Sequence, residues 1–364
     1  MHLTHLEVLS FRNVFRADVD LSSGINLLVG QNGAGKTAIL EAIYLLARGR
    51  SFRTTQSKQL ISHGDDELVV RAAADTGQMV HRLARGKSRS GETKAKIDGE
   101  SAHKQSRFAE LLPLQALLPG IADFVLDGPS IRREFVDWGL FHVEHQYLEI
   151  SRRYRKALSQ RSAWFRERRD GTFDQDPWAQ DVAKQGALIN QRRKGFVASL
   201  DQQVRRVFAA LGAELEVRLV YHGVGDTEDT AVAMAQLAES YERDVRHGTT
   251  HIGPHRNDID ITLDGANAKT TVSRGQAKLI ASAVVLAYCA ELSQQCNVLP
   301  VLLLDDFGAE LDNDHRERFF LELERIGCQV IATTTDEPKY LVGEALASRA
   351  RVFHVEQGGI SRYS

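Results

Sequence analysis

The sequence feature that most constrains the fold is a glycine-rich segment near the N-terminus, Gly30-Gln31-Asn32-Gly33-Ala34-Gly35-Lys36-Thr37. It fits the phosphate-binding loop pattern, in which glycines, a lysine and a hydroxyl residue stand at fixed spacing. The apolar run 25–29 before it predicts a strand, and residues 38–47 after it have the apolar spacing of a helix. A strand, a glycine turn and a helix N-terminus together make an anion site, because the turn's N–H groups and the helix dipole point at the ligand.

The residue types in this loop indicate a nucleotide and a metal ion. Lys36 is expected to reach the β- and γ-phosphates, and the Thr37 hydroxyl is expected to bind Mg²⁺. The remaining predicted phosphate contacts come from the loop backbone, at Gly30, Asn32, Gly33, Ala34 and Gly35. Glycine allows positive φ and close approach of the backbone to a ligand. No Asn-Lys-x-Asp guanine reader is present, so we expect ATP with Mg²⁺ rather than GTP.

Composition restricts the class of protein. With 43% hydrophobic and 26% charged residues the chain is an ordinary globular protein, and its length predicts two domains or one large discontinuous one. No signal peptide is apparent, and we find no apolar run of the length needed to span a bilayer. The three cysteines are an odd number without metal-ligand spacing, which suits reduced thiols. We therefore expect a cytoplasmic, nucleoid-associated protein that does not enter a membrane.

The order of the patterns predicts an α/β protein with an inserted helical lobe. Strand patterns cover residues 2–30 and 67–97, and the second group is expected to form an antiparallel sheet. The stretch 129–211 is helical throughout and leaves no room for alternating strands and helices. After strand 215–221 and helix 229–245, the predicted elements are helix 274–294, strand 298–305, helix 314–326 and strand 329–333.

A second chemical motif lies at the end of the apolar run 298–305. Leu302-Leu303-Leu304-Asp305-Asp306 has the form of a Walker B strand, and ligands bind where parallel strands end. Asp305 is expected to hold Mg²⁺, directly or through water. Asp306 is expected to orient or deprotonate the attacking water. A solvated Asp-Asp turn is the alternative.

Three further segments resemble motifs of ABC-type ATPases. Ser273-Arg274-Gly275-Gln276 resembles the signature motif, which in that class caps the γ-phosphate bound by a second subunit; a plain Ser N-cap is the alternative. Ala309-Glu310-Leu311-Asp312 resembles the D-loop that follows. Gln115 stands where a Q-loop glutamine would contact Mg²⁺ and water, although a surface glutamine is a serious alternative. The Thr333-Thr334-Thr335 run stands where a switch histidine is expected.

Along nearly its whole length the chain closely resembles the RecF family, bacterial SMC/Rad50-like ABC-type ATPases of DNA replication and repair. Lys36 and Ser273 are separated by more than half of the chain, which is typical of that branch rather than of transporter subunits. The segments that carry the resemblance are Phe11-Arg12-Asn13, Asn32–Thr37, Leu40–Tyr44, Ser51–Thr54, Arg132–His142, Gly253-Pro254-His255-Arg256, Ser273–Gln276 and Leu303–Asp306.

The resemblance implies a fold and a function. It implies an ABC-type ATPase head (a mixed sheet with the phosphate-binding loop) formed by residues 1–115 and 247–364, with 116–246 as the mainly helical lobe. It implies that Arg12 joins the ATP phosphate contacts, that ATP drives dimerisation on double-stranded or gapped DNA, and that hydrolysis is slow. RecR, with RecO, is the implied partner in loading RecA at gaps. Ala309 and Asn257 depart from the residues usual in the family.

Two basic clusters are candidates for sequence-independent DNA contact. One lies at 152–169 and the other at 82–107, and a solvated helix face with a basic loop is the alternative. The strongest DNA candidates are Arg152, Arg153, Arg155, Lys156, Lys87 and Arg89. Two other functions stay open: a generic ABC-type ATPase that acts on a protein complex without DNA, and a DNA motor. A helicase needs tandem motor domains, and a single phosphate-binding loop argues against it.

Overall fold

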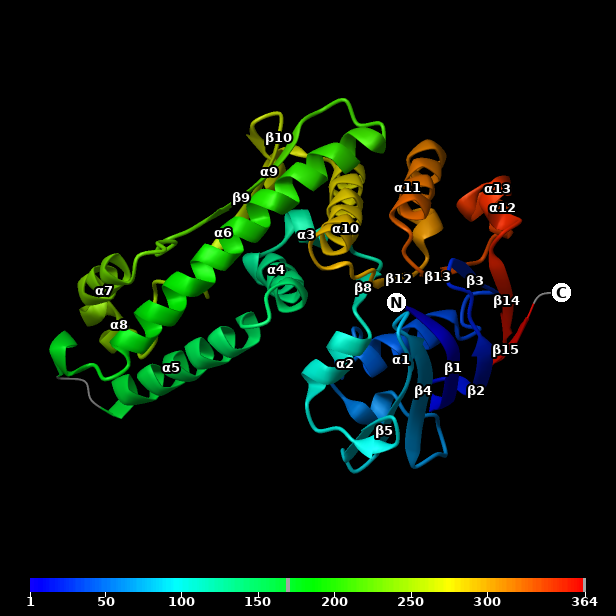
Figure 1. The fold of residues 1–364 in the computed structure, drawn as a ribbon, viewed down its shortest axis with the longest axis horizontal. Helices are drawn as coiled ribbons and strands as arrows, with labels where there is room; N and C mark the ends of the chain where they lie inside the picture. The colour runs from blue at the N-terminus through cyan, green and yellow to red at the C-terminus, as the bar shows by residue number, and fades with distance from the viewer. Residues whose placement is uncertain (168–170, 363–364) are drawn as a thin grey trace. The chain divides into compact units, whose positions relative to one another are not determined.

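The computed structural model describes residues 1–167 and 171–362, and the chain divides into two compact units (Figure 1). We call Met1–Ile121, Ala210–Gly212 and Ala281–Ser364 the head unit, and Ala122–Ala209 with Ala213–Ile280 the helical unit. The expected domain boundaries, 1–115 with 247–364 against 116–246, stay a prediction about folding domains. In the structure residues 247–280 pack with the helical unit.

A six-stranded, mostly parallel sheet in the head unit has the strand order β15-β14-β3-β13-β12-β8. The strands are β3 (Ile25–Val29), β8 (Leu114–Leu117), β12 (Val301–Leu304), β13 (Val330–Thr334), β14 (Arg351–Glu356) and β15 (Gly359–Arg362). Every residue of β12 and β13 is buried, as expected for parallel strands covered on both faces. β3 has the predicted bounds. β12 is shorter than the predicted 298–305, because Pro300, which cannot donate a backbone hydrogen bond, stands directly before its first residue.

The second sheet of the head unit is antiparallel, with the order β2-β1-β4-β5-β6-β7. Its strands are β1 (His2–Phe11), β2 (Val14–Asp20), β4 (Glu67–Asp75), β5 (Val80–Ser88), β6 (Thr93–Ile97) and β7 (Glu100–Ser101). The predicted antiparallel strands of 67–97 are therefore present, and they continue the sheet that β1 and β2 begin. Alternate residues of β4 are buried, so one face of this sheet packs on the core.

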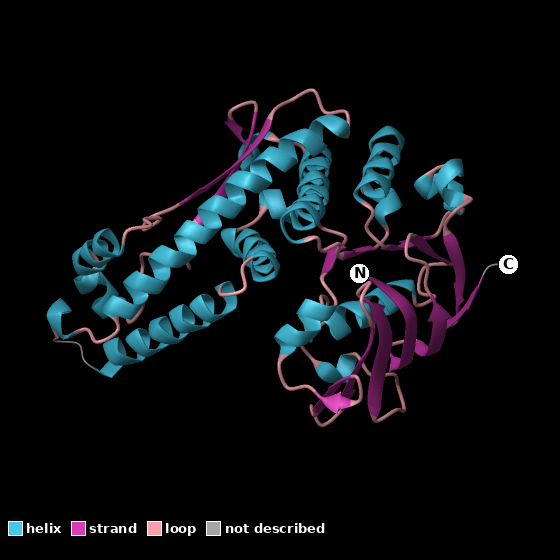
Figure 2. Cartoon of the chain, in the orientation of Figure 1, coloured by secondary structure: helices cyan, strands magenta, loops and turns pink. Residues whose placement is uncertain are grey.

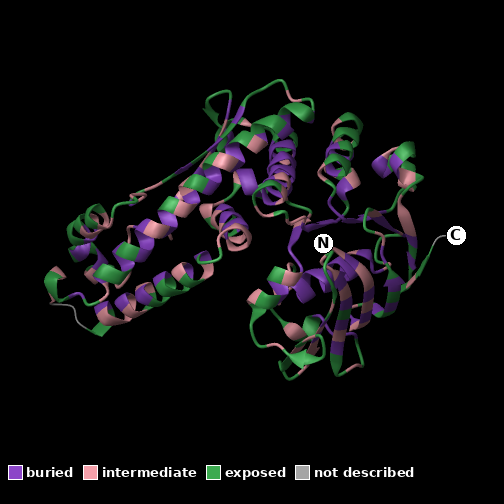
Figure 3. Cartoon of the chain, viewed as in Figure 1, coloured by how far each residue is buried: buried purple, intermediate pink, exposed green. Residues whose placement is uncertain are grey.

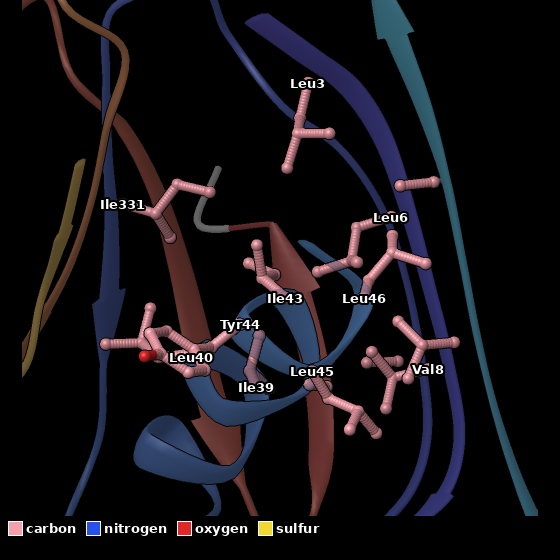
Figure 4. Packing of buried hydrophobic residues seen from close by; sticks show 14 of the residues in the cluster. Leu3, Leu6, Val8, Ile39, Leu40, Ile43, Tyr44, Leu45, Leu46 and Ile331 are labelled. Carbon is pink, nitrogen blue, oxygen red and sulfur yellow. The ribbon is translucent and has the colours of Figure 1, made fainter. Parts of the chain in front are cut away.

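The core of the head unit surrounds helix α1 (Lys36–Arg48), which follows the phosphate-binding loop. Figure 4 shows Ile39, Ile43 and Leu46 of this helix among Leu6 of β1 and Ile331 of β13. Almost all of α1 is buried, because it packs on both sheets. The loop at its N-terminus is thus fixed by a helix that has little freedom to move.

Further helices complete the head unit. They are α2 (Gln105–Leu111), α11 (Asn313–Ile326), α12 (Pro338–Val342) and α13 (Glu344–Ala347), with single 3₁₀ turns at Ser57–Gln59 and Phe307–Ala309. Helix α10 (Arg274–Cys296) has its first turns in the helical unit and the remainder in the head unit. By length and composition alone α10 could cross a membrane, which our sequence reading missed. Most of its apolar window is buried inside the protein, as in a core helix of a soluble fold (Figure 3).

The helical unit consists mainly of long helices beside a small antiparallel sheet (Figure 2). Its helices are α3 (Asp123–Leu126), α4 (Pro129–Val143), α5 (Tyr147–Glu167), α6 (Ala179–Ala210), α7 (Thr230–Glu239), α8 (Tyr241–His247) and α9 (Ala268–Thr271). The strands β9 (Val217–His222), β10 (Asp258–Leu263) and β11 (Ala266–Asn267) pair in the order β11-β10-β9. The helix predicted at 229–245 is interrupted at Ser240, where α7 ends and α8 begins. A 3₁₀ turn, Phe173–Gln175, lies in the predicted break between α5 and α6.

Candidate phosphate and metal site

The phosphate-binding loop leaves β3 and enters α1 in a conformation that requires glycine. Gly35, the N-cap of α1, has a φ of 117°, which only glycine adopts readily. A Cβ atom on Gly30 would lie 2.2 Å from the carbonyl oxygen of Val355 in β14, so the strand and the loop approach too closely for any side chain. The loop backbone therefore has the shape that its glycines predict.

Two contacts from outside the loop hold this shape. The Asn13 side-chain amide donates to the Gly33 carbonyl at 2.7 Å, and the Gly358 N–H donates to the Ala34 carbonyl at 2.9 Å. Neither residue was predicted to support the loop. Asn13 belongs to the Phe11-Arg12-Asn13 segment that carried part of the family resemblance, which was the available signal. Gly358 has no such signal, because it lies at the other end of the chain.

Lys36 is folded back over the loop. Its ammonium group donates to the carbonyls of Gly30, at 2.7 Å, and Gln31, at 2.9 Å. Burial lowers the pKa of Lys36, while the nearby Asp306 and Asp305 carboxylates act in the opposite direction. No ion pair joins Lys36 to either carboxylate among the described residues, so its charge is available to a phosphate placed in the loop.

The two Walker B carboxylates differ sharply in their surroundings. The Asp305 Oδ1 atom accepts hydrogen bonds from the Thr37 and Thr333 hydroxyls, both at 2.9 Å, and its side chain is buried. Asp306 is exposed, and its backbone N–H donates to the Thr333 hydroxyl at 2.8 Å. Asp306 also has a φ of 50°, an uncommon conformation outside glycine that is found at functional sites. Thr333 belongs to the run that stands where a switch histidine was expected, and its hydroxyl connects the Asp305 carboxylate to the Asp306 backbone.

The donor set at this point fits a magnesium ion. A threonine hydroxyl and a carboxylate are hard oxygen ligands, and Mg²⁺ in phosphate-binding proteins is bound by one or two such groups together with substrate phosphates and water. Thr37 and Asp305 lie within hydrogen-bond distance of each other. They bring the phosphate-binding loop and the Walker B strand to one place, as the sequence predicted.

Gln115 does not face the Thr37–Asp305 site. It lies inside β8 in register with Leu302 of β12. Leu303 faces the core around α1, and Asp305, two residues further on, is expected to face the same side. Gln115 therefore points to the opposite face of the sheet. Its role as a Mg²⁺ ligand stays a prediction, and this placement argues against it.

Arg12 is engaged beside the loop. Its Nε and Nη2 atoms both donate to the Glu41 carboxylate, with Nη2 2.7 Å from Oε1. The fully buried Glu41 also accepts from the Ser51 hydroxyl, and Arg53 lies 4.0 Å away. Three segments of the family resemblance therefore meet at one carboxylate. Contact between Arg12 and ATP phosphates stays a prediction.

The signature segment forms an exposed helix N-terminus in the helical unit. The Ser273 hydroxyl accepts from the Gln276 N–H at 3.2 Å, and the Gln276 side chain accepts from the Ser273 N–H at 2.9 Å. This reciprocal pair is a capping box. Arg274 and Gly275 are exposed with them at the start of α10. The Ser N-cap considered as an alternative is thus present, and its exposure leaves the helix end open to a ligand from another subunit.

In the D-loop segment, Glu310 and Leu311 follow the 3₁₀ turn that begins after Asp306. Asp312 caps α11, where its carboxylate accepts from the His315 N–H at 3.0 Å. These hydrogen bonds within the cap lower the pKa of Asp312. The segment is therefore anchored directly behind the Walker B carboxylates.

The first basic cluster is only partly a surface. Arg152, Arg153, Arg155 and Lys156 lie on the exposed side of α5, which Figure 3 shows as a helix with one buried and one exposed side. The prediction that Arg161 of the same cluster belongs to a DNA-contacting surface is wrong. It is fully buried, with ion pairs of 2.6 Å to Asp176 and 2.8 Å to Asp244. Arg168 and Arg169 lie outside the described residues.

In the second cluster the two selected DNA candidates, Lys87 and Arg89, are not fully exposed. Arg89 donates to the backbone carbonyls of Ser62, at 2.8 Å, and Asp65. Lys87 is half-buried, and burial lowers its pKa. Arg85 is buried, donates to Gln105 at 2.6 Å, and has its pKa lowered by burial to about 10. Contact of Lys87 or Arg89 with DNA stays a prediction. The exposed cations here are Arg82, Lys94, Lys96, Lys104 and Arg107.

Comparisons with known proteins agree on one family. The family described as RecF/RecN/SMC N terminal domain matches residues 2–361. The DNA replication and repair protein RecF of Shewanella sp. (strain MR-4) is 36% identical over 363 residues, with 99% of each chain covered. The protein of the same name from Shewanella woodyi is 34% identical, with 99% of this chain and 98% of the relative covered.

Solved structures show the same fold. A structure of the recombination mediator protein RecF with ATP, in the RecFOR pathway, matches with a TM-score of 0.87 at 23% identity and covers 100% of this chain and 98% of that one. An SMC head bound to the C-terminal winged-helix domain of ScpA matches with a TM-score of 0.62 at 15% identity, covering 100% and 98%. The predicted fold class, an ATPase head with an inserted helical lobe, is confirmed by these likenesses.

Proposed function

The chain belongs to the RecF family, within the RecF/RecN/SMC N terminal domain family, and from this we propose that it is an ATP-dependent DNA-binding switch of recombinational repair. ATP closes a dimer on double-stranded or gapped DNA, and slow hydrolysis opens it. With RecR and RecO as partners, the closed form promotes RecA loading at gaps, in the cytoplasm and at the nucleoid. The observation that carries the proposal is the Thr37–Asp305 contact at the phosphate-binding loop, together with an exposed signature helix end.

In the proposed site, ATP phosphates lie in the loop from Gly30 to Thr37. Lys36 exchanges its two carbonyl partners for the β- and γ-phosphates, and its charge gains more from phosphate than from neutral carbonyls. Thr37 and Asp305 hold Mg²⁺, which neutralises developing phosphate charge when bound. Thr333 fixes Asp305 relative to Asp306, so the metal ligand and the water-orienting group stay in register.

The signature segment acts in trans in this proposal. Ser273 and Gly275 of one subunit approach the γ-phosphate held by the loop of the other, so that a helix N-terminus meets an anion. Ser273 forms its capping box with its own helix, and the segment is exposed. A single subunit thus carries both halves of the arrangement, and ATP is the group that joins two subunits head to tail.

The test is ATP-dependent assembly on DNA. By sedimentation, the wild-type protein with ATP and a plain duplex should form a dimer–DNA complex, and without ATP it should remain monomeric. The Ser273→Arg variant should bind ATP as a monomer with unchanged affinity but fail to dimerise, since the added side chain blocks the helix end. Dimerisation with ATP but no affinity for duplex would favour an ATPase that acts on proteins alone. Equal loss of monomer ATP affinity in the variant would place Ser273 in its own subunit's site.

Asp306→Asn separates the roles of the two carboxylates. ABC-type ATPases usually place Glu at this position, and the shorter Asp306 reaches less far toward water. Asparagine tolerates the left-handed backbone at Asp306, so the fold should be unchanged. Since general-base assistance contributes roughly 10²–10⁴-fold, we expect ATP turnover to fall by about tenfold or more while the closed dimer lasts longer on DNA.

The control for that variant is Asp305→Asn, which should instead weaken Mg²⁺ binding and lose the dimer. Both variants are compared by phosphate release and by dimer lifetime on DNA at one Mg²⁺ concentration. Wild-type turnover in Asp306→Asn would mean that Asp306 does not activate the water.

A further inference from the structure

Two segments that are far apart in the sequence meet in the helical unit with an excess of positive charge. Arg132, in α4, makes a two-bond ion pair with Asp258, at 2.8 and 2.7 Å. Arg193, in α6, makes a similar pair with Asp137, at 2.8 and 3.0 Å. Asp258 and Asp137 are therefore each already paired with a bidentate arginine.

Two more arginines of the same region form no ion pair among the described residues, because the nearby Asp258 and Asp137 carboxylates are paired with Arg132 and Arg193. Arg133 donates from Nη1 to the backbone carbonyl of Asn257, at 2.8 Å. Arg256, the neighbour of Asn257, is exposed, and among the described residues its side chain has no hydrogen bond or ion pair. Arg133 is thus held against the segment that carries Arg256. We call these two residues the arginine pair.

His255, beside the arginine pair, does not compensate the positive charge of the two arginines. His255 bonds to the Thr250 carbonyl through Nε2, at 2.9 Å, so Nε2 carries the proton. Its Nδ1 atom then accepts from the Tyr154 hydroxyl, at 2.7 Å. Burial, and after it the charges of Arg256 and Arg133, lower the pKa of His255 to about 4. At neutral pH His255 is a neutral, fully bonded ring that fixes the loop from which Arg256 projects.

We propose that the arginine pair, Arg133 and Arg256, binds a phosphate group of the DNA backbone. Arg133 bonds to the residue that follows Arg256, and both arginines act on the His255 ring between their segments, so one anion at this place can meet both charges. Guanidinium groups suit phosphate because their planar donors match its oxygens. The inference rests on the proposed function, and it adds residues outside the basic clusters that the sequence reading selected.

A DNA phosphate fits this place better than a nucleotide phosphate does. The phosphate-binding loop, with its lysine and its metal ligands, already serves the nucleotide in the head unit. Arg256 is exposed on the surface, where a polymer backbone can lie across it. Tyr154, which bonds to His255, belongs to α5, the helix that carries the exposed Arg152, Arg155 and Lys156. The arginine pair and this basic helix side are thus joined within one unit.

The experiment compares Arg256→Ala with the full-length wild-type protein. Binding of ATP-loaded protein to a fluorescent 30-base-pair duplex, a length of about three helical turns, is measured by anisotropy at several salt concentrations. Loss of one phosphate contact should weaken binding by about fivefold to tenfold at 0.1 M salt and reduce the salt slope by about 1. Arg256→Lys keeps the charge and should recover most of the affinity.

The matched control is Arg246→Ala, which removes another exposed arginine, from α8 of the same unit. It should change the affinity by less than twofold. Wild-type affinity and salt slope in Arg256→Ala would overturn the inference, as would an equal loss in the control, which would indicate only a general charge effect.

Two further measurements distinguish a failure of the proposed function from a failure of the DNA assignment. If wild-type protein with ATP does not bind the duplex, the proposed function fails before the arginine pair is tested. If Arg256→Ala lowers ATP affinity or ATP-driven dimerisation without DNA, the pair serves the nucleotide phosphate, and the assignment to DNA is wrong. Unchanged ATP binding and an unchanged melting temperature, with weaker DNA binding, would support it.

Discussion

Replacing Lys36 with methionine is expected to abolish nucleotide-dependent dimerisation while the fold survives. Lys36 is 8% exposed, and within the described part of the chain its ammonium group is bonded only to the Gly30 and Gln31 carbonyls. Burial already disfavours its charge, as the lowered pKa shows, so an uncharged chain of similar length costs the folded state little. A nucleotide, in contrast, loses the one cation that the loop itself supplies to its phosphates.

The measurement is sedimentation with ATP and Mg²⁺, with and without duplex, alongside the affinity for a fluorescent ATP analogue. Thermal unfolding checks that the variant is folded. Lys339→Met is the matched control, since Lys339 is an exposed lysine of the same unit whose charge pairs with Glu337 at 2.9 Å. A Lys36→Met protein that still dimerised at wild-type ATP concentrations would remove the loop from the proposed mechanism.

Replacing Arg161 with methionine is expected to destabilise the protein by about 3–5 kcal/mol, because it leaves buried carboxylates without a partner. The Asp176 and Asp244 side chains are both fully buried, and both bond to the Arg161 guanidinium. Asp244 also accepts from the His251 backbone and ring, which partly serves its other oxygen. Among the residues that the structure describes, Asp176 keeps only the Trp178 N–H on its remaining oxygen. Both carboxylates therefore lose charge compensation in the variant.

Urea unfolding gives the change in stability, followed by the signal of the tryptophans in the helical unit. Arg155→Met, on the exposed side of the same helix, should change stability by less than about 0.5 kcal/mol. If Arg161→Met were as stable as Arg155→Met and instead bound DNA less tightly, Arg161 would belong to the DNA surface as the sequence suggested, and its burial would be wrong.

The parts that could be predicted are those whose evidence is local in the sequence. The strand 25–29, the glycine turn and the following helix are contiguous, so spacing alone gives their order and their chemistry. The apolar runs that became β12 and β13 are readable because strands covered on both faces need no alternation. Thr37 and Asp305 were assigned to one site because both motifs end at the same edge of a parallel sheet.

The parts that could not be predicted depend on partners distant in the chain. A count of lysine and arginine treats Arg161 and Arg155 alike, although only Arg161 meets two carboxylates in the fold. Gln115 stood at the expected spacing, but the pleat of β8 turns it to the face away from α1. Asn13 supports the loop through a hydrogen bond to Gly33, and no rule of local spacing connects the two.

The buried Glu41 carboxylate has a consequence for how freely this chain can change during evolution. Arg12, Ser51 and Arg53 approach the same carboxylate from two other segments. Substitution of any one of these three residues leaves Glu41 with other partners, so a single substitution should cost only a moderate amount of stability. Losing Glu41 removes the carboxylate that all three approach and leaves the charges of Arg12 and Arg53 without it. We therefore expect substitutions to be tolerated more often at Arg12, Ser51 or Arg53 than at Glu41.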